Sequence, residues 1–173
     1  MATMLETLRM LAARGVVEEI AVAFAEFIGR LDGRGDPGMM LAACWVSHST
    51  AQGNICVDLR EWAGQTLFND GELTVTAPPL AQWSRTLRES AAVGAPGAAR
   101  PLISDDAQRL YLYRYWDYER RLAENVLARA QENIEGIALP DLRAALDEFF
   151  AEATDDTLDW QRMAVAVAVL KRF

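Results

Sequence analysis

The sequence predicts a mainly α-helical domain with a small β component, an α+β fold of helices with one short strand and a β-hairpin. Apolar residues recur at helical spacing over most of the chain, whereas strand-like alternation is confined to two short stretches. Of the 173 residues, 51% are hydrophobic and 24% charged, which is typical of a globular chain that buries its own core. No apolar run approaches the ~20 residues of a membrane span.

Two helices are predicted at the N-terminus, and Gly15 separates them. The first covers residues 4–12. The second covers residues 16–31, because apolar side chains recur there at the spacing of one helix face. We expect that face to turn toward the core; its members are Val16, Val17, Ile20, Phe24, Phe27, Ile28 and Leu31.

A third helix is predicted after the breaker cluster “GRLDGRGDPGM”. Asp36 before Pro37 is a typical helix start, because the carboxylate caps free N–H groups and proline needs no N–H at the first position. From Met39 to about Ser49 the helix is almost wholly apolar, which predicts a central position.

The middle of the chain has weaker patterns. “GNICVDL” predicts a short strand after a Gly-Asn turn, with Ile55 and Val57 on one face. Asp58 is placed to cap a short helix over “LREWAGQTLF”, and the small residues of “AAVGAPGAAR” predict a loop. Between them lies another short helix, whose apolar face consists of Leu80, Trp83 and Leu87.

The stretch “RLYLYRYWDYERRLAENV”, residues 109–126, is rich in tyrosine and arginine. With the preceding “PLISDDAQ” it predicts two strands joined by a polar turn at residues 105–108. Leu110 and Leu112 then share one face of the second strand. From about Trp116 the period becomes helical, so we expect this indole to have a structural role between the hairpin and neighbouring helices.

The arginines of this stretch leave a second interpretation open. Single-stranded nucleic acid binds aromatic side chains inside a positive groove. Acidic neighbours dilute the positive charge here, and the chain as a whole has a net charge of −8. Because non-specific DNA affinity depends on phosphate neutralisation, we expect weak DNA binding at most. The candidates for contact with DNA or a protein partner are Arg109, Arg114, Arg120 and Arg121.

Two later helices complete the prediction. Their apolar faces are Leu142, Ala145, Leu146, Phe149 and Phe150 in one, and Trp160, Met163, Ala164, Val167 and Leu170 in the other. The predicted organisation is a helical N-terminal docking region at residues 1–100, a hairpin with helices at 101–157, and a last helical segment at 158–173.

No catalytic or metal-binding set is predicted. Cys44 and His48 stand four residues apart on one helix and Cys56 follows, but no fourth ligand is evident and buried cysteines are common in cores. The only lysine is Lys171, and the sequence lacks the G-x-x-x-x-G-K-[ST] phosphate loop, so we expect no ATP hydrolysis. Two cysteines and no signal-peptide pattern indicate a cytoplasmic chain without a membrane partner.

Three stretches occur in order from about residue 35 to the end: “MMLAACWVSHSTAQGNICVDL”, “RLYLYRYWDYERRLA” and “LDWQRMAVAVAVLKRF”. They resemble the N-terminal region of the RecD subunit of bacterial exodeoxyribonuclease V, the RecBCD helicase–nuclease. In the second, the resemblance makes Glu119 a structural residue that opens a helix. The third resembles the helix that runs into the first strand of the helicase motor, just before its phosphate loop.

This resemblance implies an N-terminal part of a RecD-like 5′-to-3′ DNA helicase subunit without its motor. Unwinding driven by ATP and Mg²⁺ would belong to the parent protein, and this part would need no cofactor. Gln161 stands where such helicases have a glutamine that contacts adenine, so its nucleotide-binding role would be latent here. The implied partners are RecC-like and RecB-like subunits.

Three hypotheses therefore stand. The first is a non-catalytic domain that docks a helicase subunit to RecC-like and RecB-like partners in double-strand-break repair and recombination. The second is a DNA-contacting accessory domain that guides a single strand to the motor. The third is a free-standing helical metal-binding regulator that uses Cys44, His48 and Cys56.

Overall fold

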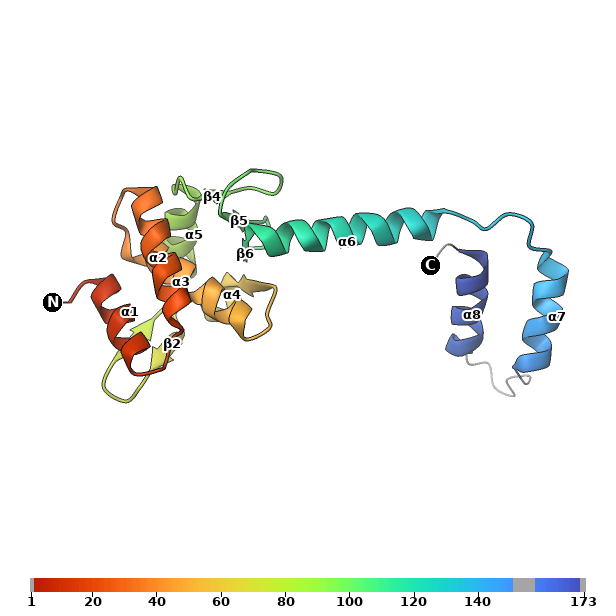
Figure 1. The fold of residues 1–173 in the computed structure, drawn as a ribbon, viewed down its shortest axis with the longest axis horizontal. Helices are drawn as coiled ribbons and strands as arrows, with labels where there is room; N and C mark the ends of the chain where they lie inside the picture. Colours follow the sequence, from red (N-terminus) through yellow and green to blue (C-terminus); the bar gives the residue numbers. More distant parts are fainter. Residues whose placement is uncertain (1, 151–157, 172–173) are drawn as a thin grey trace. The chain divides into compact units, whose positions relative to one another are not determined.

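The computed structural model describes residues 2–150 and 158–171. It confirms the predicted α+β class, because helices dominate and the strands are few and short (Figure 1). The chain divides into two compact units, Met1–Tyr118 and Glu119–Phe173, and the boundary falls within one long helix, α6 (Tyr113–Gln131). No helix among the described residues is long and apolar enough to cross a membrane.

The first unit is built around α3 (Pro37–Ala51), which is buried on nearly every side. It packs against helices on one side and strands on the other, and its mostly apolar sequence suits that position. Asp36 caps α3 as predicted, because its carboxylate accepts hydrogen bonds from the N–H groups of Gly38 at 2.8 Å and Met39 at 3.2 Å.

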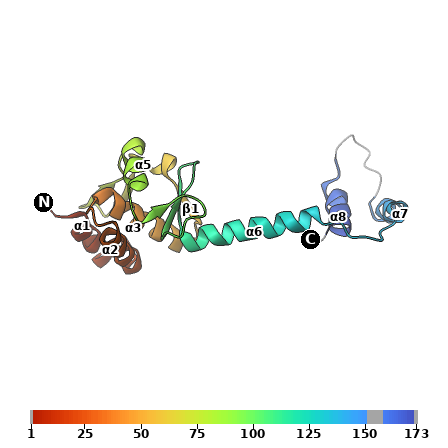
Figure 2. The same cartoon turned by 90° about the horizontal axis from the view of Figure 1, so that it is seen from above.

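The two predicted N-terminal helices are confirmed as α1 (Met4–Ala13) and α2 (Glu19–Asp32). They lie together on one side of α3, opposite the larger sheet (Figure 2). α1 begins with a capping box: the N–H of Glu6 donates to Oγ1 of Thr3 at 3.2 Å, and the N–H of Thr3 donates to the Glu6 carboxylate at 2.7 Å.

The larger sheet has the strand order β1-β6-β5-β4. Its strands are β1 (Cys56–Asp58), β6 (Arg109–Leu112), β5 (Leu102–Ser104) and β4 (Val93–Gly94). The antiparallel β5–β6 pair confirms the predicted hairpin, and in its turn the N–H of Gln108 donates to the carbonyl of Asp105 at 3.1 Å. The stretch predicted as a loop contains β4, which pairs in parallel with β5.

A second, two-stranded sheet replaces part of a predicted helix. Asp58 caps α4 (Leu59–Trp62) as predicted, but α4 ends after one turn. Gly64 follows with a φ of 73°, a left-handed conformation that leads the chain away from the helix. β2 (Thr66–Asn69) then pairs with β3 (Thr74–Thr76). The helix predicted over this stretch is therefore wrong beyond α4.

One more helix closes the core of the first unit. In α5 (Leu80–Arg88), Trp83 is fully buried as the helical pattern predicts. Its indole Nε1 donates a hydrogen bond of 3.0 Å to the carbonyl of Gly38 at the start of α3. The tryptophan thus fixes α5 to the central helix by both packing and a polar contact.

The second unit consists of the later part of α6 with α7 (Leu139–Phe149) and α8 (Trp160–Leu170), which confirm the two predicted last helices. α7 and α8 pack against each other, and the N–H of Gln161 donates to the capping carboxylate of Asp159 at 3.0 Å. None of the residues described in this unit is fully buried. α6 begins at Tyr113, earlier than the sequence pattern predicts.

Candidate docking surface

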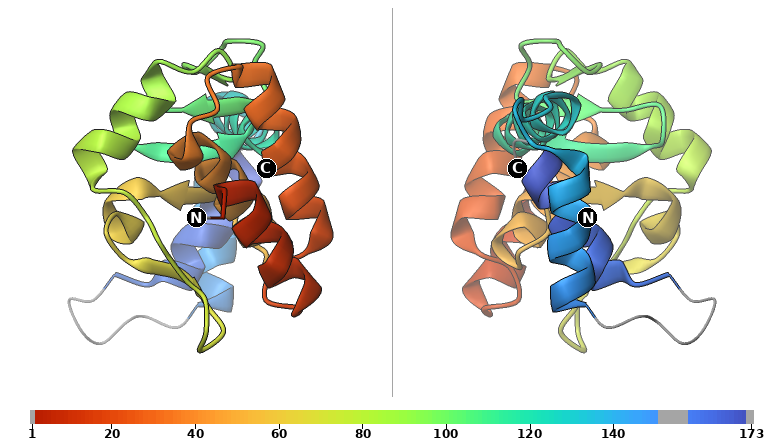
Figure 3. Two further views of the ribbon diagram at one scale, coloured as in Figure 1. Left: turned by 90° about the vertical axis from the view of Figure 1, so that its left-hand side faces the viewer. Right: turned by 90° about the vertical axis from the view of Figure 1, so that its right-hand side faces the viewer.

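The outward face of α2 holds large apolar side chains. Ile20 is 68% exposed, Phe27 47% and Leu31 44%, and Phe24 is half-buried. They follow each other at i, i+4, i+7 and i+11, so they form one stripe along the helix. α2 itself lies at the outer edge of the first unit (Figure 3). The expectation that this stripe faces the core is therefore wrong for Ile20, Phe27 and Leu31.

A row of small residues lies on the inward face of α2. Ala21 and Ala25 are fully buried, and a Cβ added to Gly29 would lie 3.0 Å from Cγ of Met40 in α3. These three residues stand four apart on the face that packs against α3, and a row of small residues lets two helices approach closely. Val22 and Ile28 of α2 are buried as well, whereas Ile20, Phe27 and Leu31 are exposed. The sequence contains this row of small residues, but the large apolar residues give the stronger periodic pattern.

Two charged residues border the stripe, and neither has a charged partner among the described residues. Glu19 and Arg30 are both exposed, and because they stand about three helical turns apart, they lie on the same edge of it. The nearby acidic residues are paired within the chain: Glu18 with His48 at 2.6 Å, Glu26 with Arg9 at 2.8 Å, and Asp32 with Arg34 at 3.1 Å.

The six residues Glu19, Ile20, Phe24, Phe27, Arg30 and Leu31 are hereafter named the α2 ridge. An apolar strip with a charged rim, exposed on the outside of a domain, has the composition of a protein-docking face. Aromatic side chains are enriched at the centre of such faces, which is where Phe24 and Phe27 lie along the ridge. Their ring centres are 6.4 Å apart, and Phe24 also packs against the core.

The four arginines proposed for DNA or partner contact all interact within the chain. Arg109 pairs with Asp105 at 2.7 Å, and Arg120 pairs with Glu124 at 2.7 Å. The guanidinium of Arg114 lies 5.0 Å from the ring centre of Tyr115, and Arg121 also has an internal partner. Each of these interactions competes with a phosphate. The geometry therefore gives no support to a preformed DNA groove on these side chains.

The predicted structural residues of the same stretch lie at the start of α6. Trp116 is half-buried and its ring lies 6.2 Å from that of Tyr113, and Glu119 is exposed. The structural roles of both residues stay predictions.

The two cysteines and the histidine do not form a metal centre among the described residues. Cys44 is fully buried in α3, and burial raises the pKa of its thiol to about 12. His48 stacks on Trp45 with ring centres 5.5 Å apart and bonds through Nδ1 to Oε2 of Glu18 at 2.6 Å. Cys56 is half-buried in β1. These residues are used in packing and in joining α2 to α3.

Comparison with known proteins decides the family. Residues 13–111, more than half of the chain, match a family described as “RecBCD enzyme subunit RecD, N-terminal domain”. The chain belongs to this family. A curated relative, the RecBCD enzyme subunit RecD of Mycolicibacterium smegmatis, is 29% identical over 154 residues, which cover 89% of this chain and 25% of the relative. The chain therefore spans about a quarter of the length of that RecD.

The RecD family match contains the whole α2 ridge and ends within β6, so α7 and α8 lie beyond it. Gln161, the candidate for adenine contact, is exposed in the first turn of α8. Its proposed role as a latent nucleotide contact stays a prediction.

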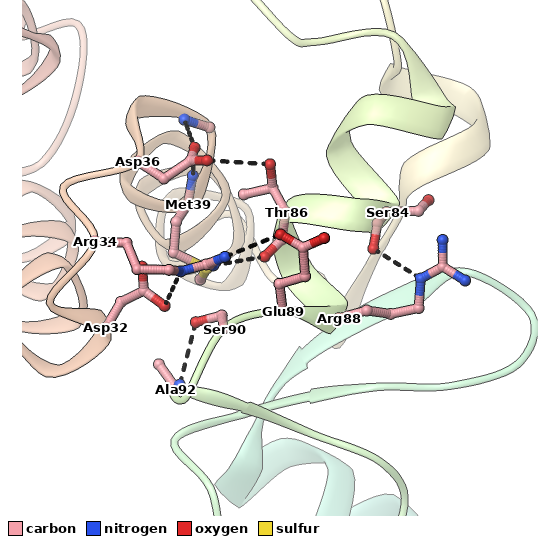
Figure 4. Close-up of polar contacts among 11 residues, drawn as sticks. Asp32, Arg34, Asp36, Met39, Ser84, Thr86, Arg88, Glu89, Ser90 and Ala92 are labelled. Atoms are coloured by element: carbon pink, nitrogen blue, oxygen red, sulfur yellow. Dashed lines mark hydrogen bonds and ion pairs between the residues drawn. The ribbon is translucent and has the colours of Figure 1, made fainter.

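A polar latch within the RecD family match holds the end of the α2 ridge in place (Figure 4). Arg34, in the loop after α2, donates to both carboxylate oxygens of Asp32 at 3.1 and 3.2 Å and to the carbonyl of Thr86 in α5 at 2.9 Å. Burial opposes ionisation of Asp32, but hydrogen bonds from Ser90 and Arg34 outweigh it and lower its pKa. The latch fixes the helix directly after Leu31.

Proposed function

We propose that this chain is the non-catalytic docking domain of a RecD-like DNA helicase subunit, which attaches that subunit to RecC-like and RecB-like partners in the cytoplasm. The enzyme so assembled would act in double-strand-break repair and recombination. The observation that carries the proposal is the α2 ridge, an exposed apolar strip within the residues that match the RecD N-terminal family.

The apolar side chains of the ridge favour burial against a permanent protein partner over exposure to water. Exposed aromatic and aliphatic side chains stabilise a complex by about 25 cal/mol per Å² of apolar surface removed from water. A stripe on a rigid helix with packed neighbours loses little conformational entropy when it binds. The rest of the parent protein would supply ATP and Mg²⁺ chemistry, and contact with DNA would be weak or made through the complete enzyme.

Capture by partner subunits tests this function. The chain is co-expressed with the RecC-like and RecB-like subunits of its own organism, and the purified complex is analysed for its presence. Ile20→Asp places a charge in the stripe and is expected to abolish capture, because a buried unpaired carboxylate opposes binding strongly.

Ile55→Asp is the matched control, since Ile55 is also an exposed isoleucine of the first unit, at 51%, but lies outside the ridge. We expect this variant to be captured like the unmodified chain. Equal capture of the Ile20 and Ile55 variants would contradict docking through α2.

A further inference from the structure

The α2 ridge is complementary to a second copy of itself. Its apolar residues are placed symmetrically about the middle of the stripe: Phe24 and Phe27 are equally far from that point, and so are Ile20 and Leu31. When two such helices pack antiparallel about a two-fold axis, Phe24 meets Phe27 of the second copy, and Ile20 meets Leu31 of the second copy. Isologous pairing of this kind requires one self-complementary surface.

The rim charges obey the same symmetry. At a rise of about 1.5 Å per residue, an antiparallel pair places Glu19 about 3 Å along the axis from Arg30 of the second copy, on the same edge. An arginine side chain spans that offset, so an ion pair forms at each end of the contact. A parallel two-fold pair would instead place each residue and its copy at the same height but on opposite edges of the contact, so neither Glu19–Arg30 ion pair would form.

We propose that, in the absence of a partner subunit, the α2 ridge pairs with the ridge of a second copy in an antiparallel homodimer. The 14-residue helix offers a strip about 21 Å long and about 10 Å wide. This is well below the ~800 Å² that each partner contributes to a standard stable interface. The dimer is therefore weak and reversible, with a Kd of about 10–100 µM, and a larger partner interface displaces it.

Self-pairing shields the apolar stripe from water until a partner subunit is present. This protective role rests on the proposed docking function, because it assumes that the same face later binds a partner. The pairing itself depends only on the geometry and charges of α2.

Charge reversal in the 173-residue chain tests the pairing. Sedimentation velocity over about 1–500 µM protein reports the monomer–dimer equilibrium. Glu19→Arg and Arg30→Glu are each expected to weaken the dimer by about tenfold or more, because each turns two attractive contacts into repulsive ones. The double variant Glu19→Arg/Arg30→Glu is expected to restore the original Kd to within about threefold, because the pairs reform with opposite sign. Thermal melts confirm that all variants fold.

Three results would overturn the proposal: a chain that stays monomeric at the highest concentration, a dimer that neither single reversal weakens, or a double variant without recovery. The experiments distinguish failure of self-pairing from failure of the proposed docking function. Capture by RecC-like and RecB-like subunits together with a strictly monomeric free chain overturns self-pairing alone. If the double variant recovers the dimer but the chain is not captured by the partner subunits, self-pairing is supported and only its protective role is ruled out.

Discussion

The orientation of α2 can be tested by making the same substitution at two isoleucines of this helix. Ile28 is fully buried and Ile20 is 68% exposed, although both lie on the same helix. Replacing either by alanine removes the same three carbon atoms. Any difference in the free energy of unfolding therefore reports where each side chain lies.

The expected magnitudes follow from burial. Loss of three buried carbons at Ile28 costs about 2.4 kcal/mol in transfer free energy, at ~0.8 kcal/mol each. The cavity left behind raises this to about 3–4 kcal/mol, within the range measured for such substitutions. At Ile20 only about a third of the side chain is shielded from water, so the transfer loss is about 0.8 kcal/mol. The higher helix propensity of alanine returns about 0.4 kcal/mol of it.

Urea unfolding followed by circular dichroism at about 1 µM protein, where self-association contributes little, measures both variants against the unmodified chain. We expect Ile28→Ala to lose about 3–4 kcal/mol and Ile20→Ala less than about 0.5 kcal/mol. Similar losses at the two positions, or a larger loss at Ile20, would refute the orientation of α2 and with it the ridge.

Three further predictions concern polar contacts of the first unit. Hydrogen bonds from the N–H of Leu73 and from Arg14 lower the pKa of Asp70 from 3.8 to about 2, so its ionised carboxylate stabilises the fold above about pH 4. Asp70→Asn should therefore lower Tm at pH 7, and the difference in Tm from the unmodified chain should shrink as the pH falls from about 4 to about 2. A difference in Tm that does not change with pH would contradict this. Gln108 has a φ of 63°, so Gln108→Gly should be more stable than Gln108→Ala by about 1 kcal/mol in urea unfolding, and equal stabilities would show that the turn relaxes. Arg34→Lys should lower Tm, because an ammonium does not reproduce the planar fork of the guanidinium; an unchanged Tm would show that the latch is dispensable.

The helices and the hairpin of the first unit were predictable because their signals are local. Asp36 and Pro37 specify the start of α3 within two adjacent residues. The turn between β5 and β6 is likewise set by its own sequence, where the side chain of Asp105 accepts a hydrogen bond from the N–H of Arg109 at 2.9 Å. Such contacts form between neighbours in the chain, so the sequence alone specifies them.

Features that depend on tertiary contacts were missed. β4 consists only of Val93 and Gly94, and it is a strand because β5 lies beside it. β2 and β3 pair across a turn held by Asp70, whose carboxylate accepts from the N–H of Glu72 at 2.9 Å, and no strong alternation announces either strand.

The orientation of α2 about its own axis, which determines the candidate site, was also not predictable from the sequence. Periodicity identifies an apolar helix, but it does not say which of the apolar residues pack inward. That choice depends on tertiary contacts such as the one at Gly29, where an added Cβ would lie 3.0 Å from Cγ of Met40 in α3. The residues of the ridge were therefore visible in the sequence as a stripe, and only the structure placed them outside.

Hydrogen exchange in the assembled enzyme tests the central claim most directly. Peptides that span α2 are compared between the free chain at low concentration and its complex with RecC-like and RecB-like subunits, with peptides from α5 as the internal reference. The docking role of the α2 ridge predicts slower exchange in α2 on assembly and little change in α5. Unchanged exchange in α2, with protection elsewhere in the first unit, would contradict it.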